Sequence, residues 1–321
     1  MPIIDMPLAE LHQYKGTNPK PYDFDAYWER ALAELDAVKP QPELVPSTFQ
    51  TPQAECFDLY YSSVRGARIH AKYVRPAGVS SPHPVVLLFH GYSGSAGDWF
   101  DKLSYASLGF SVLAMDCRGQ GGSSEDTGGV KGTTQNGHII RGLNDHPDQL
   151  LFRHIFLDTA QLARVALELP ESDPARIYAA GGSQGGGLTL ACAALEPRIS
   201  RLAPIFPFLS DYRRVWEMDL AKDAYQEIRS FFRDHDPLHE REEELFTRLG
   251  YIDVQHLADR IQGDVLMMTG LMDTVCPPST QFAAYNKITA SKRLIVYPDF
   301  GHEYLPGSND KTLQFLLEGN G

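Results

Sequence analysis

The sequence predicts an α/β fold in which a mostly parallel central sheet carries helices on both faces. The main observation is a repeated order of apolar strand, glycine-containing turn and helix, with strands near residues 85, 111, 177 and 264. Strands that alternate with helices in this way pair in parallel. The chain has 321 residues, of which 43% are hydrophobic and 11% aromatic, so it can bury a large core. We therefore expect one domain over residues 1–321.

Residues 1–45 are predicted to form an extension ahead of the sheet. An aromatic segment at 22–28 leads into a helix expected over 30–38, with Asp25 as a candidate N-cap. We expect these aromatic rings to pack against the main body or another subunit rather than to bind a ligand.

The first strands are predicted to be antiparallel. Residues 56–61 and 68–74 alternate in polarity around Arg65-Gly66-Ala67, which is typical of a hairpin. Residues 124–147 are rich in Gly, Thr, Asn and His and predict a long irregular loop, which in compact domains is usually functional or mobile. The other expected elements are strands at 84–89, 110–116, 177–180, 202–207, 264–270 and 292–297, and helices at 101–108, 149–169, 188–195, from 279, and at 309–317.

The strand and helix pattern breaks at about residues 207–260. Charged, aromatic helices are expected there over 212–220, 225–234 and 238–249. We interpret this segment as a helical insertion over the C-terminal edge of the sheet. It would act as a lid and help to shape a pocket.

Composition limits the partners of the chain. Its formal net charge of -12 argues against nucleic acid, whose phosphates bind basic surfaces, and against anionic lipid. No apolar run approaches the roughly 20 residues of a membrane span, and the first residues show no basic segment followed by an apolar one. The cysteines are widely spaced, without a C-x-x-C motif, and predict free, mostly buried thiols in a cytoplasmic protein: Cys56, Cys117, Cys192 and Cys276.

The residues Gly181-Gly182-Ser183-Gln184-Gly185 fit G-x-S-x-G, the nucleophile elbow of α/β-hydrolases. A sharp strand-to-helix turn forces the serine into a strained backbone conformation, and a Cβ two residues to either side would collide with the neighbouring backbone. The helix N-terminus would stabilise negative charge near the hydroxyl. The alternative is a plain glycine-rich turn or a phosphate cradle, but no Lys-Ser/Thr pair and no early G-x-G-x-x-G supports a phosphate loop.

A serine nucleophile needs a base, and the base needs an acid to fix its tautomer. In this fold the acid and then the histidine follow the serine along the chain, each on a loop after a strand. His302 follows the last expected strand and is assigned as the base, the alternative being a surface-loop histidine. Asp273 follows the preceding strand and is assigned as the acid. Asp299 is its rival, although it lies on the same tight loop as His302.

Acyl transfer also needs an oxyanion hole of two backbone N–H groups, and losing one typically costs on the order of a hundredfold in rate. One group is expected from Gln184, directly after the serine. The other should come from the loop at 90–94, where Gly91 lets the backbone turn and Tyr92 is the favoured donor.

Three motifs together resemble the acetyl xylan esterase and cephalosporin C deacetylase family, carbohydrate esterase family 7. They are Arg118-Gly119-Gln120-Gly121-Gly122, the serine elbow with Gly186, and His302-Glu303. The chain length and the aromatic segment at 22–28 match as well. The resemblance implies deacetylation of short acetylated xylo-oligosaccharides and of cephalosporins, with no metal or organic cofactor. It also implies Ser183, His302 and Asp273 as the triad, Tyr92 and Gln184 as oxyanion donors, and a doughnut-shaped homohexamer that admits small esters.

Other residues have competing interpretations. The donor fork of Arg118, beside Gly119 and Gln120, is expected to tie loop carbonyls or a carboxylate together, with substrate contact as the alternative. Residues 234–240 resemble a metal-ligand cluster but fit an exposed acidic turn better. Glu303 has two interpretations: a side chain that contacts the catalytic residues from behind, or a solvent-exposed residue without a role in the site. The last group comprises loop or helix-face histidines: His138, His146 and His154.

Two other functions remain open. A general carboxylesterase or a peptidase of the same fold would use the same Ser, Asp and His. An inert binding module would keep the fold without the chemistry, although the intact set of three residues argues against it.

Overall fold

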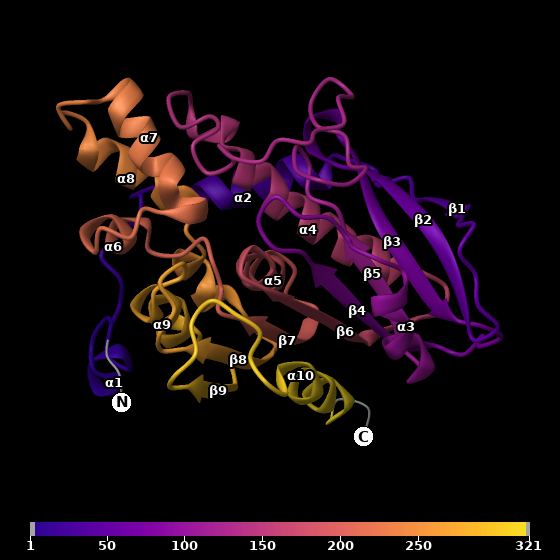
Figure 1. Ribbon diagram of the computed structural model, residues 1–321. Helices are drawn as coiled ribbons and strands as arrows, with labels where there is room; N and C mark the ends of the chain where they lie inside the picture. Colours follow the sequence, from indigo (N-terminus) through magenta and orange to yellow (C-terminus); the bar gives the residue numbers. More distant parts are fainter. Residues whose placement is uncertain (1–3, 319–321) are drawn as a thin grey trace.

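The computed structural model describes residues 4–318 of the chain. In this part, nine strands form one sheet with the order β1-β2-β3-β5-β4-β6-β7-β8-β9 (Figure 1). The strands are β1 (Glu43–Pro46), β2 (Ala54–Ser62), β3 (Arg68–Pro76), β4 (His83–Phe89), β5 (Ser111–Met115), β6 (Ser172–Gly182), β7 (Ile199–Ile205), β8 (Asp264–Gly270) and β9 (Lys292–Tyr297).

The sheet is mixed, as predicted. Strands β1, β2 and β3 pair antiparallel, β3 also pairs antiparallel with β5, and every pair from β5 through β9 is parallel. The expected hairpin of β2 and β3 turns at Arg65, which has a φ of 60°. Strand β1 was not expected, because all four of its residues are exposed and give no hydrophobic pattern.

Helices cover both faces of the sheet. They are α1 (Leu8–Leu11), α2 (Phe24–Asp36), α3 (Phe100–Ser107), α4 (Leu151–Glu168), α5 (Gln184–Leu195), α6 (Tyr212–Glu217), α7 (Gln226–His235), α8 (Glu242–Leu249), α9 (Pro278–Lys287) and α10 (Ser308–Leu317). Alternate residues of β4 separate the two faces. Val85 and Leu87 share a core with α2, α4 and α5, whereas Val86 and Leu88 pack with residues of α3 and α10.

The N-terminal helix α2 begins earlier than expected. Its N-cap is Asp23, so the prediction of Asp25 as the N-cap is wrong. The helix starts at Phe24 because its apolar face already includes Phe24, Tyr27 and Trp28, each at most 1% exposed. The indole of Trp28 donates to the carbonyl of Tyr251 at 3.1 Å. These rings therefore pack against the body of their own chain, as the first of the two packing alternatives predicted.

A second contact anchors the N-terminal segment on the insertion. The carboxylate of Asp211 accepts hydrogen bonds from the backbone N–H groups of Thr17 at 2.9 Å and Asn18 at 2.8 Å. The hydroxyl of Tyr14 donates to the other carboxylate oxygen at 2.7 Å. One buried side chain thus binds three residues from the start of the chain.

The insertion contains the three expected helices, α6, α7 and α8, which Figure 1 shows in orange beside the central sheet. Helix α8 begins at Glu242, later than the expected residue 238. Asp236 accepts the N–H groups of Glu240 and Arg241 at 3.0 and 2.9 Å, so a capped turn precedes the helix. Within residues 4–318, no helix has the length and apolar character that a membrane span requires.

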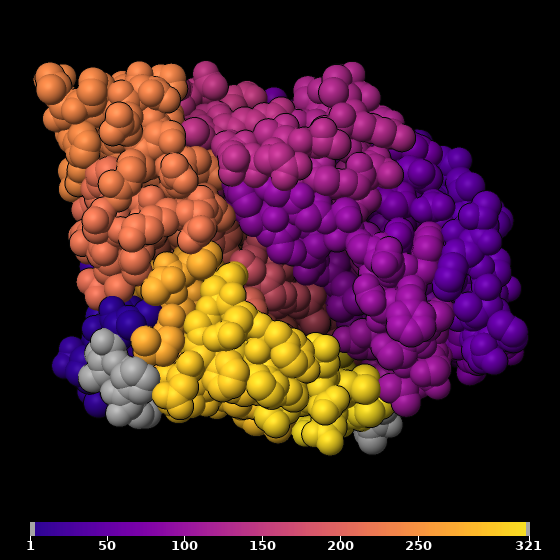
Figure 2. All heavy atoms as spheres, viewed as in Figure 1, coloured from indigo at the N-terminus to yellow at the C-terminus, as the bar shows by residue number. Residues whose placement is uncertain are grey.

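A hollow lies between α3 and α10 (Figure 2). It is a cavity of about 260 Å³ that Lys102, Ala180, Gly181 and Thr312 help to line. The two helices therefore leave part of their sheet face uncovered, behind the end of β6.

Candidate active site

Ser183 lies at the turn between β6 and α5, with φ 57° and ψ -122°. A Cβ at Gly185 would lie 2.0 Å from the carbonyl oxygen of Phe89 on β4. A Cβ at Gly181 would lie 2.6 Å from the backbone of Gly185. The strained serine and the crowding at both flanking glycines agree with the turn that the sequence predicts.

The three side chains assigned from the sequence meet at this turn. The Nε2 atom of His302 lies 3.0 Å from Ser183 Oγ, and its Nδ1 atom lies 2.9 Å from Asp273 Oδ2. A carboxylate that accepts the Nδ1 proton leaves the Nε2 lone pair free to accept the serine proton. The arrangement can therefore turn Ser183 into a nucleophile.

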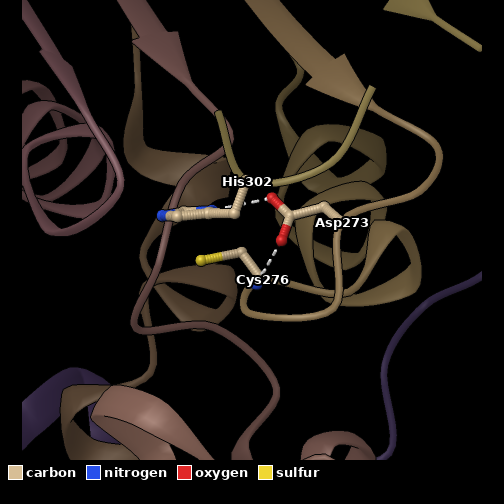
Figure 3. A group of neighbouring side chains, drawn as sticks. All are labelled: Asp273, Cys276 and His302. Atoms are coloured by element: carbon tan, nitrogen blue, oxygen red, sulfur yellow. Dashed lines mark hydrogen bonds and ion pairs between the residues drawn. The ribbon is translucent and has the colours of Figure 1, made fainter. Parts of the chain in front are cut away.

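Backbone donors fix the carboxylate of Asp273, which is fully buried on the loop after β8. Its Oδ1 atom accepts from the N–H groups of Val275 at 2.9 Å and Cys276 at 2.8 Å. The dashed lines of Figure 3 run from Asp273 to His302 and to the backbone of Cys276. The rival Asp299 is exposed.

Two more side chains surround the histidine. The ring of Phe206 lies 4.6 Å from the His302 ring, centroid to centroid. The fully buried thiol of Cys276 lies beside Asp273 and His302 (Figure 3). Burial raises the pKa of this thiol well above its ordinary value, so the group is a neutral neighbour of the site.

A metal ion could find donors here, because ligand atoms of Asp273, Cys276 and His302 lie within 4.8 Å of one another. Both ring nitrogens of His302, however, already have hydrogen-bond partners, Nδ1 in Asp273 and Nε2 in Ser183. The neutral thiol would also have to lose its proton. The donor set therefore fits a proton-transfer site better than a metal site.

The two expected oxyanion donors come from neighbouring parallel strands. Gln184 is the first residue of α5, where helix N–H groups have no intrahelical acceptor, and Tyr92 follows β4. Strands β4 and β6 pair in parallel up to Phe89 and Gly181, so both segments leave the sheet at the same edge. Among the described residues, no protein acceptor takes the N–H of Tyr92 or Gln184.

Gln120 ties these two segments together. Its Oε1 atom accepts the N–H of Ser93 at 2.9 Å, and its amide bonds the side chain of Gln184 at 2.8 Å. Gln120 was expected only as part of a motif near the site. The structure gives it a specific contact with each oxyanion segment.

Arg118 is fully buried and faces away from solvent. Its Nε donates to Asp158 Oδ2 at 2.7 Å, its Nη2 donates to Asp158 Oδ1 at 2.5 Å, and Nη2 also donates to the carbonyl of Val64 at 3.2 Å. These contacts tie the loop after β5 to α4 and are of the kind expected for a structural role of Arg118, a carboxylate and a carbonyl held by one donor fork. Gly119 follows with a φ of 74°.

The other residues singled out lie elsewhere. Glu303 is exposed, and its carboxylate accepts the N–H of Gly301 at 3.0 Å. His146 is exposed, whereas His154 is buried and bonds the carbonyl of Asp148 at 3.0 Å. His138 is buried, with its ring 4.9 Å from that of Tyr92.

Sequence reasoning missed three residues around this centre: Cys276, Asp158 and Glu227. Asp158 and Glu227 stand in amphipathic helical segments, where a carboxylate is normally exposed, and Cys276 is one of several isolated cysteines. The contacts of Asp158 with Arg118 and of Glu227 with Tyr92 join segments far apart in the chain, so no local pattern could have identified these two carboxylates.

The serine turn, the ordered acid and histidine and the mostly parallel sheet define a protein of the α/β-hydrolase fold class. The chain belongs to the acetyl xylan esterase family, because the family model "Acetyl xylan esterase (AXE1)" matches residues 1–318. The resemblance inferred from the three motifs is therefore confirmed.

Two solved structures are similar to nearly the whole chain. Acetyl xylan esterase 1 from Thermoanaerobacterium sp. JW/SL YS485 is 61% identical, with a TM-score of 0.96, over 99% of this chain and 100% of that chain. An acetyl xylan esterase from Paenibacillus sp. R4 is 36% identical, with a TM-score of 0.90, over 98% of this chain and 99% of that chain.

A curated relative is longer. Acetyl esterase Axe7A from Xylanibacter ruminicola is 29% identical over 292 residues, which are 88% of this chain. The chain spans 64% of the length of that relative.

Proposed function

We propose that the protein is a serine esterase that removes acetyl groups from small acetylated carbohydrates. The observation that carries the proposal is the chain of contacts from Ser183 Oγ to His302 Nε2 at 3.0 Å and from His302 Nδ1 to Asp273 Oδ2 at 2.9 Å. Membership of the acetyl xylan esterase family supports acetyl esters as the substrate class.

The first step of the proposed mechanism is acylation. Ser183 Oγ attacks the acetyl carbonyl while His302 Nε2 takes the serine proton, and the ionised Asp273 stabilises the resulting imidazolium. The N–H groups of Tyr92 and Gln184 donate to the oxyanion. When the tetrahedral intermediate collapses, the bond from the carbonyl carbon to the sugar oxygen breaks, and the alcohol leaves with the proton from His302.

Deacylation repeats these steps with water. His302 takes a proton from water, the hydroxide attacks the acetyl-serine, and the same two N–H groups hold the oxyanion. Acetate leaves and Ser183 regains its proton from His302. The residues named supply every proton transfer, so the mechanism needs no metal or organic cofactor.

The finer parts of the proposal rest on the family resemblance. We propose xylo-oligosaccharide acetates and the acetyl ester of cephalosporins as substrates, and a homohexamer as the assembly. The insertion would act as a lid over the site. The buried, unpaired cysteines of residues 4–318 are compatible with a reducing cytoplasm. Light scattering should give the mass of six chains, and a monomer mass would contradict the hexamer.

The test is the Ser183→Ala variant, compared with Ser200→Ala as a control at a hydroxyl that donates to the carbonyl of Ile177 at 3.2 Å. We expect Ser183→Ala to lose at least about a thousandfold in kcat for 4-nitrophenyl acetate and to resist labelling by a fluorophosphonate. Ser200→Ala should keep both properties. Wild-type turnover by Ser183→Ala would rule the proposal out.

Substrate class is tested by acetate release from acetylated xylo-oligosaccharides, cephalosporin C and esters with longer acyl chains. A clear preference for acetyl esters supports the proposal. Hydrolysis of an anilide at a rate similar to that of the matching ester would instead favour a peptidase of the same fold.

A further inference from the structure

Glu227 is a buried carboxylate close to the candidate site, and the mechanism above does not use it. It is the second residue of α7 in the insertion and is 6% exposed. Its Oε1 atom accepts a short hydrogen bond from the hydroxyl of Tyr92, the residue whose backbone N–H we assign to the oxyanion hole. A buried carboxylate is costly unless donors surround it, so this position has a specific role.

The second oxygen of Glu227 binds a different segment. Its Oε2 atom accepts the backbone N–H groups of Ile139 at 2.7 Å and Ile140 at 3.0 Å, in the irregular loop at 124–147. One carboxylate therefore joins three parts of the chain: the insertion helix, the irregular loop and the loop after β4.

The loop around Tyr92 needs such an anchor. A Cβ at Gly91 would have no atom within 4 Å, and Ser93 has a φ of 57°, so the backbone on either side is loosely packed or strained. The Tyr92 ring contacts the rings of His138 and Phe208, with centroid distances of 4.9 and 5.7 Å. These edge contacts locate the ring, and the hydroxyl bond fixes its far end.

The direction of that hydroxyl bond is determined by a neighbour. The Tyr92 oxygen already accepts the N–H of His138 at 3.3 Å, so its proton points at Glu227. A glutamine at 227 would need its oxygen for Ile139 and Ile140, which leaves an NH₂ group facing the Tyr92 hydroxyl. An NH₂ group cannot accept the Tyr92 proton, so the bond that Tyr92 donates would be lost, and only a weaker bond donated by the amide to the Tyr92 oxygen could replace it, with little change in shape.

We propose that Glu227 is a positioning residue, which holds the Tyr92 side chain so that the Tyr92 backbone N–H points at the oxyanion. The inference rests on the proposed esterase function. Under this proposal the insertion affects the rate of the reaction by positioning an oxyanion donor, in addition to acting as a lid over the site.

The test uses Glu227→Gln, Tyr92→Phe and the double variant, with 4-nitrophenyl acetate as substrate. Each single variant should lower kcat about tenfold with little change in KM, because a displaced oxyanion donor weakens transition-state binding more than substrate binding. The double variant should be no slower than either single variant, since both changes remove the same bond.

Tyr14→Phe is the matched control, because it removes another tyrosine–carboxylate bond, to Asp211 at 2.7 Å, on the insertion. It should leave kcat unchanged. The inference is wrong if both single variants keep kcat within twofold of the wild type, or if only their KM changes. It is also wrong if the losses in kcat multiply in the double variant, or if Tyr14→Phe lowers kcat by the same factor. If circular dichroism shows that Glu227→Gln does not fold, the inference is decided by comparing the kcat of Tyr92→Phe with that of Tyr14→Phe.

Ser183→Ala separates the two proposals. An active Ser183→Ala variant contradicts the esterase mechanism, whatever Glu227 does. An inactive Ser183→Ala variant together with wild-type kcat in Tyr92→Phe and Glu227→Gln contradicts the positioning role alone.

Discussion

Ser183 keeps a backbone conformation that is costly for a residue with a side chain, at φ 57° and ψ -122°. The surrounding backbone must therefore hold it there. Ser183 N–H donates to the carbonyl of Ile205 at 3.0 Å, and its own carbonyl accepts the N–H groups of Gly187 at 3.1 Å and Phe208 at 3.0 Å. The proposed nucleophile is thus held by three backbone bonds, to β7, to α5 and to the loop after β7.

Gly185→Ala should break this arrangement. Its new Cβ would lie 2.0 Å from the Phe89 carbonyl oxygen, so the turn must move, at a cost of about 3 kcal/mol in the free energy of unfolding. We expect activity to fall with stability, as measured by urea unfolding and turnover of 4-nitrophenyl acetate.

Gly182→Ala is the matched control at the same turn, because its Cβ would meet nothing nearer than the Phe206 ring at 3.4 Å. It should be nearly as stable as the wild type. Equal destabilisation of both variants would show that the crowding at Gly185 is not the cause.

At the scale of elements, the buried pair of Arg118 and Asp158 joins the loop after β5 to α4. Both side chains are fully buried, and their contact is bidentate. Asp158→Asn leaves the guanidinium as an uncompensated buried charge. It should lower the free energy of unfolding by about 3–5 kcal/mol, as measured by denaturant titration.

Two comparisons test this interpretation. The double variant Arg118→Met, Asp158→Leu removes both charges and should lose less stability than Asp158→Asn alone. Glu243→Gln breaks the pair with Arg213, where Glu243 is 80% exposed, and should leave the free energy of unfolding nearly unchanged. A double variant as unstable as the single one would contradict a charge-based cost.

The strands and helices differ in how well the sequence alone predicts them. The strands around the site were predicted because parallel strands buried on both faces give long apolar runs, as in β4 and β8. The start of α2 was missed because Asp25 matched an N-cap by residue type. The helix in fact begins before Asp25, at Phe24, because the Phe24 side chain is buried. The contact of Ser183, His302 and Asp273 could be predicted because each of the three residues lies on a loop after a strand. Glu227 was not, since only the fold brings it to Tyr92.

For the whole molecule, buried histidines make stability depend on pH. Burial, together with the nearby charges of Arg118, Arg153 and Arg65, lowers the pKa of His154 from 6.5 to about 3. Between pH 6.5 and about 3, His154 therefore binds a proton in the unfolded chain but not in the folded chain. The contribution of His154 is fully present above pH 6.5 and is lost as the pH falls from 6.5 towards 3, by about 1.4 kcal/mol per pH unit.

His154→Gln should flatten this dependence, since a glutamine NH₂ can still donate to the Asp148 carbonyl but cannot take up the proton. The check is the free energy of unfolding from urea titrations between pH 7 and pH 5, where the variant should lose less stability than the wild type. Parallel curves for the two proteins would contradict the assignment.

The anchoring of Thr17 and Asn18 on Asp211 has a consequence for how the chain is made. The partners are 194 and 193 positions apart, so on the ribosome the N-terminal segment emerges on the order of ten seconds or more before Asp211 is synthesised. During that interval the aromatic face of α2 also lacks its Tyr251 partner. A segment translated before every strand of the sheet is therefore among the last to dock, and until then the nascent chain presents an apolar surface that chaperones can bind.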